Sequence, residues 1–197
     1  MVSVRINGDD SPVGGGASLK IAELIELIKA SIDPEHMITS ILLEGRELAE
    51  EDWAAPVSQF GAATVDISTG TPKSFVNDRL DKASSIVREC YLQFRDARKT
   101  FQDGKMLQGN QQLVKAVNTL KSFFEWYSTL LELSEGDRRK EIDITPQVTD
   151  ISEVCKRICQ QQLYQSWWAL GETIAKELEP KLDKLEDFFR KYQTQVQ

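Results

Sequence analysis

The sequence predicts an α+β domain followed by an all-helical domain, because the hydrophobic period changes near Gly70. Before this residue, short apolar segments alternate with turn residues and enclose one brief helical pattern; after it, apolar residues recur every three or four positions. A chain of 197 residues that is 41% apolar can build two modest cores. We therefore expect domains at residues 1–70 and 73–197, joined at Thr71-Pro72, where the residue before proline resists helical geometry.

Charge is divided unevenly between the two halves. Residues 1–72 carry a net charge of −8 and residues 73–197 a net charge of +1. An acidic half repels phosphate backbones and anionic lipids, so we expect neither nucleic acid nor membrane as a partner. The three cysteines are too few and too irregular for a disulfide framework, and no apolar run approaches the ~18 residues of a membrane span. With no signal-like N-terminal pattern, we expect a cytoplasmic protein.

The first domain begins with strand-like alternation. Residues 2–6 alternate between apolar and polar, which predicts a strand, and turn residues 7–10 precede a short second strand. Ser18 is expected to cap a helix that ends at residues 33–34. The apolar face of this helix is formed by Ile21, Leu24, Ile25, Ile28 and Ile32. A third strand is expected at residues 38–43, before a turn at 44–46, and a last strand at residues 63–67.

The run ILLEGREL at residues 41–48, followed by acidic residues, a loop and the strand 63–67, resembles the second half of a ubiquitin-like β-grasp domain. The opening strand and the helix fit the same order, so the resemblance covers residues 1–70 and implies a β-grasp fold. Ubiquitin-like modifiers end in a conjugated Gly-Gly tail, which this chain lacks, so conjugation is not expected. Leu42 matches one position of the apolar recognition patch of the family, whereas Asp66 falls where the last strand would contribute another.

The second domain is expected to be a bundle of three long helices. The first carries an a/d stripe of Val76, Leu80, Ala83, Val87, Cys90, Phe94, Ala97 and Phe101. The second is expected to start at Asn110 with a broader buried face of Leu113, Val117, Leu120, Phe124, Tyr127 and Leu131, widened by Ala116, Phe123 and Leu130. The basic run at residues 138–140 is interpreted as a solvated loop.

The third helical pattern starts at Thr149 or Asp150 and continues to Tyr192. An unbroken helix of this length would extend roughly 70 Å, against about 40 Å for its neighbours. Pro180 lies inside the pattern while the stripe stays in phase, so we expect one kinked helix, with a separate fourth helix beginning near Pro180 as the alternative.

The excess length suggests where a partner binds. We predict that the stripe after Pro180 contacts a protein partner or a second copy, unless the helix folds back onto its own bundle. The predicted partner-binding residues are Leu182, Leu185, Phe189 and Tyr192, with Trp168 second and Leu42 third. Adaptor and scaffold proteins with a helical bundle commonly hold an amphipathic partner helix against an apolar stripe or groove of the bundle.

The sequence predicts neither a catalytic site nor a metal or cofactor site. Cys155 and Cys159 fall on the apolar stripe and are interpreted as core thiols, and the only histidine, His36, lies in the other domain, so no metal, cofactor or triad is expected. Residues 50–52 are interpreted as charged surface. The sequence favours a non-catalytic adaptor, scaffold or helical chaperone.

Two alternatives stay open. The first is a ligand-binding protein or enzyme with a closed pocket lined by Trp126, Trp167, Gln160 and Gln165. The second is a structural subunit of a larger assembly. A ligand-binding protein requires polar groups that converge on one cavity, and a structural subunit requires a stable oligomer.

Overall fold

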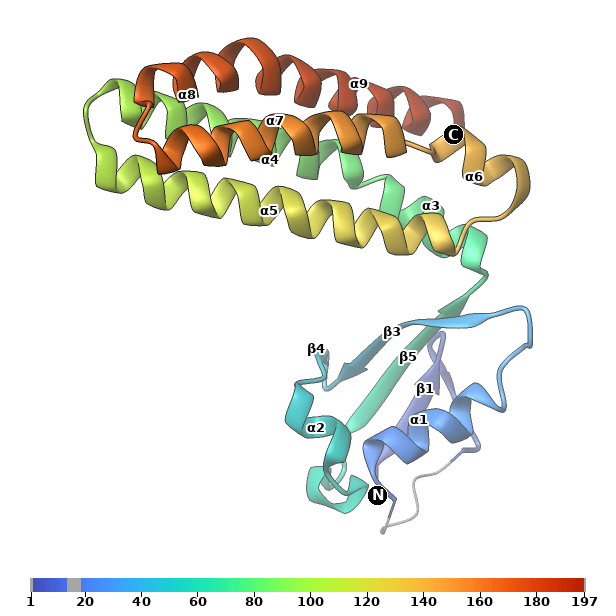
Figure 1. The fold of residues 1–197 in the computed structure, drawn as a ribbon. Helices are drawn as coiled ribbons and strands as arrows, with labels where there is room; N and C mark the ends of the chain where they lie inside the picture. The colour runs from blue at the N-terminus through green and yellow to red at the C-terminus, as the bar shows by residue number, and fades with distance from the viewer. Residues whose placement is uncertain (1, 14–18, 197) are drawn as a thin grey trace. The chain divides into compact units, whose positions relative to one another are not determined.

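The computed structural model describes residues 2–13 and 19–196, with side chains described up to Gln193. The chain is an α+β protein in which a five-stranded mixed sheet precedes a set of helices (Figure 1). It divides into two compact units between Phe75 and Val76. The sequence-based boundary at residues 70–73 lies a few residues earlier, because the helix Pro72–Leu80 spans the division.

The N-terminal unit contains the sheet. Its strands are β1 (Ser3–Ile6), β2 (Asp9–Asp10), β3 (Met37–Leu43), β4 (Arg46–Glu47) and β5 (Thr64–Gly70). Their spatial order is β2-β1-β5-β3-β4, with β1 parallel to β5 and the other neighbours antiparallel. The turn between β3 and β4 has Glu44 and Gly45 at positive φ, the conformation that tight hairpins require.

One face of the sheet is covered by α1 (Ile21–Lys29). Ile21, Leu24, Ile25 and Ile28 are buried together with sheet residues such as Val4, Val65 and Ile67. At the start of α1, the carboxylate of Glu23 accepts a hydrogen bond from the backbone N–H of Lys20 at 2.9 Å. The expected cap, Ser18, lies outside the described residues.

Glu50 and Glu51 are exposed, as expected of charged surface, but the same prediction is wrong for Asp52. The three residues begin α2 (Glu50–Ala54), which precedes a 3₁₀ turn, η1 (Val57–Phe60). The side chain of Asp52 is buried and accepts hydrogen bonds from Arg46 Nη1 at 2.6 Å and from the backbone N–H of Ala49 at 2.8 Å. Asp52 therefore ties β4 to the start of α2.

Asp52 is expected to titrate below its ordinary pKa of 3.8, because Arg46 and the Ala49 N–H both stabilise its carboxylate. A lowered folded-state pKa means that the charged form stabilises this unit above the unfolded pKa, and that the stabilisation is lost as pH falls through the folded pKa. Carbon-detected NMR titration of the Asp52 carboxyl checks the shift, and Arg46→Gln should raise its midpoint. A wild-type midpoint at or above the ordinary value would contradict this account.

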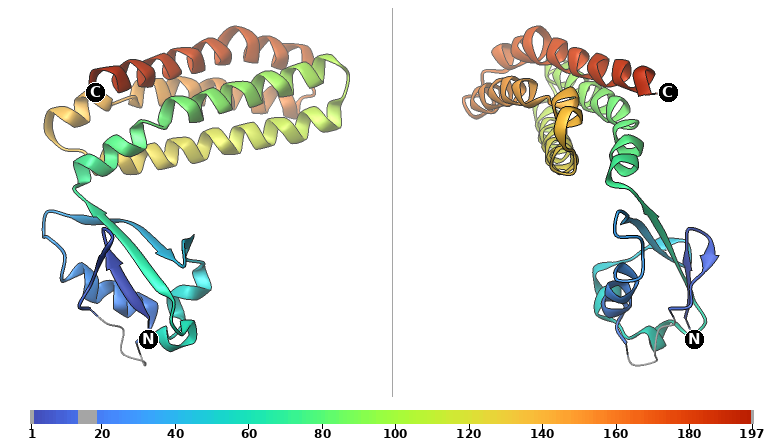
Figure 2. Two further views of the ribbon diagram at one scale, coloured as in Figure 1. Left: turned by 180° about the vertical axis from the view of Figure 1, so that it is seen from behind. Right: turned by 90° about the vertical axis from the view of Figure 1, so that its right-hand side faces the viewer.

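The C-terminal unit is helical. Its elements are α3 (Pro72–Leu80), α4 (Ala83–Gln102), α5 (Met106–Glu132), α6 (Gly136–Ile142), α7 (Thr145–Leu163), α8 (Trp167–Thr173), a π-helical turn η2 (Ile174–Leu178) and α9 (Glu179–Val196). Within the described residues, α4, α5, α7 and the continuous segment from α8 to α9 run side by side as a bundle (Figures 1 and 2).

The predicted stripe from Val76 to Phe101 is buried at every position, although α3 and α4 are separate helices. The second long helix starts at Met106 rather than at the predicted cap, Asn110. It includes Gly109, where a Cβ atom would lie 2.8 Å from ring carbons of Phe101. Glycine is required there by the close approach of α4 and α5.

The prediction of one long helix kinked at Pro180 is wrong. The chain turns back between Leu163 and Trp167, with Gln165 at φ +55°, and then runs without interruption from α8 through η2 into α9. A proline ring clashes with the carbonyl four residues earlier in a regular helix. That carbonyl belongs to Lys176, inside the π-helical turn, whose shifted hydrogen-bond register accommodates Pro180.

Folding back removes the reason given above for a C-terminal docking stripe. Leu182, Leu185, Phe189 and Tyr192 are all buried within the helical unit. The ring of Phe189 meets Phe123 and Tyr127 of α5 edge-on, with centroids 6.0 and 6.1 Å apart. This stripe is the inner face of the bundle and needs no cover from another chain.

The basic run 138–140 is likewise not a loop but part of α6. Arg138 is half-buried, donates a hydrogen bond to Asn77 Oδ1 and lies over the ring of Tyr192, 5.2 Å from its centroid. The guanidinium thereby connects α6 to α3 and α9.

Candidate functional site

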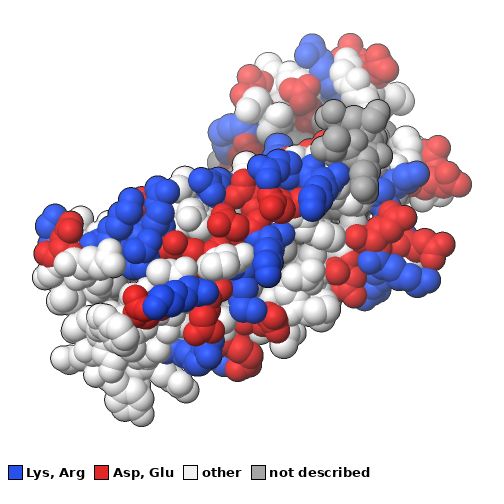
Figure 3. All heavy atoms as spheres, turned by 90° about the horizontal axis from the view of Figure 1, so that it is seen from above, with Lys and Arg blue, Asp and Glu red and all other residues white. Residues whose placement is uncertain are grey.

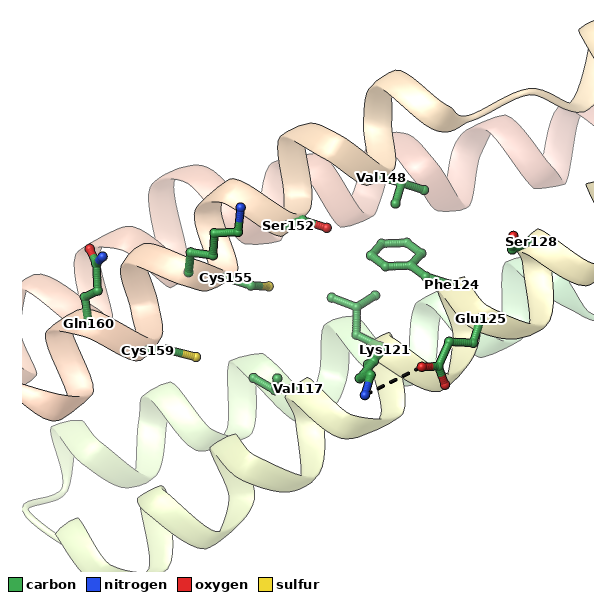
Figure 4. A pocket seen from close by; sticks show the side chains of 12 residues that line it. Val117, Lys121, Phe124, Glu125, Ser128, Val148, Ser152, Cys155, Cys159 and Gln160 are labelled. Carbon is green, nitrogen blue, oxygen red and sulfur yellow. Dashed lines mark ion pairs between the residues drawn. The ribbon is translucent and has the colours of Figure 1, made fainter.

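An apolar hollow of the helical unit lies between α5 and α7. It has a volume of about 750 Å³ and opens to solvent as a groove (Figure 4). We call it the α5–α7 groove, and it is lined by Val117, Leu120, Lys121, Phe124, Glu125, Ser128, Val148, Ser152, Cys155, Lys156, Cys159 and Gln160.

The groove exists because α5 and α7 hardly touch. α5 packs closely against α4, and α7 packs against α8 and η2, so the seam between α5 and α7 is left open. Most side chains on the α7 wall are short: Val148, Ser152 and Cys155 reach too little across the seam to fill it. The apolar walls therefore remain accessible from solvent.

Each wall of the groove follows a heptad spacing. On α5, one stripe at steps of four and three is buried: Gly109, Leu113, Ala116, Leu120, Phe123, Tyr127 and Leu130. A second stripe at the same spacing is half-buried or exposed: Leu107, Asn110, Val114, Val117, Lys121, Phe124 and Ser128. Its last four members line the groove, and Asn110 lines a neighbouring hollow. On α7 the groove stripe is Val148, Ser152, Cys155, Cys159 and, beyond the groove, Gln162. Two helices that present heptad stripes to one seam form the kind of surface that a third helix packs against.

This second stripe corrects the prediction of one broad buried face on α5. Val117, Phe124 and Leu131 are only half-buried, and Val114 is exposed. The signal in the sequence was the width of the apolar face, which is greater than one packing partner needs.

The rim of the groove carries a lysine on each wall. Lys121 lies 3.6 Å from Glu125, and Lys156 lies 2.5 Å from Glu153. The two lysine side chains are 72% and 68% exposed, so each pair contributes only about 0.3–0.5 kcal/mol. Both ammonium groups are free to exchange these partners for carboxylates of a bound molecule.

The groove continues toward the end of the bundle where α7 turns into α8. A second hollow shares Cys159 with the groove, and a third shares Trp167 with the second. Around them, Leu107, Leu163, Tyr164 and Trp168 are between 76% and 80% exposed, which is unusual for large apolar side chains. Figure 3 shows an uncharged area at this end of the bundle, at lower left, whereas Lys, Arg, Asp and Glu side chains are frequent farther along the bundle.

The prediction that Cys155 and Cys159 are both core thiols is wrong. Cys155 is half-buried and Cys159 is exposed, and both side chains point into the groove (Figure 4). Burial raises the pKa of the Cys155 thiol to about 12, and that of the buried Cys90 to about 12 as well. Cys159 is therefore the accessible thiol of the groove.

The alternative ligand pocket does not assemble. Trp126 contacts Phe123, with ring centroids 5.6 Å apart, whereas Trp167 stacks on Phe101 at 5.2 Å. Gln160 lines the α5–α7 groove, but Gln165 and Trp167 line the second hollow. Among the described residues, no group of three or more His, Cys, Asp or Glu side chains could hold a metal ion.

The other predicted contact residues have separate positions. Trp168 lies at the exposed end of the bundle, whereas Leu42 is half-buried on β3, opposite Glu47 and Asp66 of the neighbouring strands. In the part of the chain that the structure describes, no helix combines the length and apolar character that crossing a bilayer requires. No protein-family model, curated protein or solved structure matches the chain.

Proposed function

We propose that this chain is a non-catalytic protein–protein interaction module that binds its partner through the α5–α7 groove and the adjoining end of the helical bundle. The observation that carries the proposal is the group of exposed side chains at that end: Leu107, Leu163, Tyr164 and Trp168. Patches of this kind, next to an apolar groove and without charged groups, are typical of protein-binding surfaces.

The distribution of polar groups supports binding over catalysis. The groove is lined by apolar side chains and two thiols, with Ser128, Ser152 and Gln160 among them, while Lys121, Lys156 and Glu125 lie on the rim. An acid–base or nucleophilic site needs polar groups that converge on one reacting atom.

For the N-terminal unit we propose a ubiquitin-like β-grasp domain. The support is the strand order β2-β1-β5-β3-β4, the parallel pairing of β1 with β5, and α1 packed on one face. We retain Leu42 as a minor candidate contact on its sheet. An intracellular, cytoplasmic role as adaptor or scaffold remains our prediction from the cysteine content.

The proposal predicts that the double variant Leu163→Ser/Trp168→Ser loses the proteins that the wild-type chain retains in affinity capture from its native cells. Both side chains are exposed, so the variant should keep its far-UV circular dichroism spectrum. The matched control is Leu27→Ser/Trp53→Ser, which removes the same residue types from exposed positions of the N-terminal unit. Mass spectrometry identifies the retained proteins. An unchanged set with Leu163→Ser/Trp168→Ser would refute the proposal, as would an empty set with the wild type.

A further inference from the structure

We infer that the partner element is a single amphipathic helix of about three heptads, with acidic residues flanking its apolar stripe, docked lengthwise in the α5–α7 groove. This inference rests on the proposed function and specifies the occupant of the same surface.

The spacing of residues along each wall of the groove indicates that the occupant is a helix. The outer stripe of α5 runs from Leu107 to Ser128, and 22 helical residues extend about 32 Å. The facing stripe of α7 keeps the same alternation of three and four residues. A third helix with apolar residues at a and d positions would interdigitate with both stripes at a small crossing angle. An extended peptide would find no free backbone edge on two helices, whose N–H and C=O groups are paired internally.

The charged residues at the rim of the groove indicate which residues flank the apolar stripe of the partner helix. Of the charged residues lining the groove, Lys121 and Lys156 are basic and lie on opposite walls, and Glu125 is acidic; Glu153, which pairs with Lys156, lies outside the lining. A bound helix with glutamates on both sides of its stripe would meet a lysine on each wall, whereas lysine flanks would be repelled.

The same features disfavour a second copy of this chain as the occupant. The surface is concave, and two concave grooves leave a void between them when they face each other. A two-fold contact centred on the groove would also bring the lysines of one copy toward those of the other. A convex helix fills the hollow without either cost.

The test uses two synthetic 22-residue peptides on the full-length protein. Both have alternating leucine and alanine at the a and d positions; one has glutamates beside the stripe, and the other has lysines at the same positions. Fluorescence anisotropy at low salt should show that the glutamate peptide binds at least about tenfold more tightly, and that added salt narrows the difference.

Charge reversal provides the control. Lys121→Glu/Lys156→Glu should invert the preference between the peptides. Lys184→Glu/Lys191→Glu, at exposed positions of α9, changes the net charge equally and should leave the preference as in the wild type. Equal binding of the two peptides, or the same preference in both double variants, would overturn the inference.

Two further outcomes would also overturn it. The first is no binding of either peptide; if Leu163→Ser/Trp168→Ser still abolishes capture of the native partner, the proposed function stands and only the helical occupant is wrong. The second is a dimeric mass by light scattering that Val117→Glu converts to a monomeric one, which would assign the groove to a second copy.

Discussion

Replacing Phe189 with alanine is expected to lower the free energy of unfolding of the helical unit by about 3–5 kcal/mol. Phe189 of α9 is 1% exposed, and its ring contacts the rings of Phe123 and Tyr127 on α5. Removing the ring forfeits its burial and leaves a cavity that the neighbouring rings fill only in part. Urea denaturation followed by circular dichroism measures the change.

The control for this prediction is Trp168→Ala, which removes a larger ring at an exposed position and should change stability by less than about 0.5 kcal/mol. If Phe189→Ala were as harmless as Trp168→Ala, the C-terminal stripe would not be core. The docking role that the sequence predicted for Leu185 and Phe189 would then regain its basis.

The variant Arg98→Met is expected to lower the free energy of unfolding by about 3 kcal/mol, because it leaves the largely buried carboxylate of Glu179 without its partner. Arg98 of α4 donates hydrogen bonds from Nε and Nη2 to Glu179, at 2.8 and 3.4 Å. The two side chains are only 17% and 11% exposed. The pair joins α4 to the first residue of α9, directly after the π-helical turn.

The double variant Arg98→Met/Glu179→Met should recover most of this loss, since two apolar side chains of similar length replace both charges. Arg157→Met is the matched control: Arg157 pairs with Glu177 at an exposed position, and its loss should cost less than about 1 kcal/mol. Thermal unfolding of the four proteins gives the comparison. A loss in the double variant as large as that of Arg98→Met, or larger, would show that the two charges do not act as a pair.

Hydrophobic spacing predicted the inner faces of the helices because burial follows the period of the helix. The positions from Val76 to Phe101 on the first stripe are all buried, as are Leu182, Leu185 and Phe189 on the last. Periodicity identifies which face is apolar, but it does not identify what covers that face. The same stripe therefore fitted both a projecting helix and one that folds back.

The place of the break could not be predicted, because residues 164–166 lack the usual signals. Tyr, Gln and Ser are not helix breakers. The turn depends on a positive φ at Gln165, which residues other than glycine rarely adopt. Pro180 is a strong breaker in sequence, yet the π-helical turn before it lets the helix continue. Local propensity was overridden by packing at both positions.

The sequence predicted the apolar residues of the groove but not their exposure. Val117 and Phe124 were recognised as apolar, but their half-exposure depends on how far α7 stands from α5, which no local pattern determines. The prediction that Cys159 is a core thiol is wrong for the same reason. The exposure of Trp168 was closer to the prediction, because adjacent helix positions diverge by about 100° and Trp167 occupies the inner face.

The most direct test of the groove is the rate at which a maleimide alkylates Cys159 in the full-length protein, with and without the captured partner at saturation. Cys159 is exposed in the groove, whereas Cys90 is buried and serves as an internal reference that should not react in either state. We expect the rate at Cys159 to fall at least about tenfold when the partner is bound. An unchanged rate in the complex would contradict the claim that the partner occupies the α5–α7 groove.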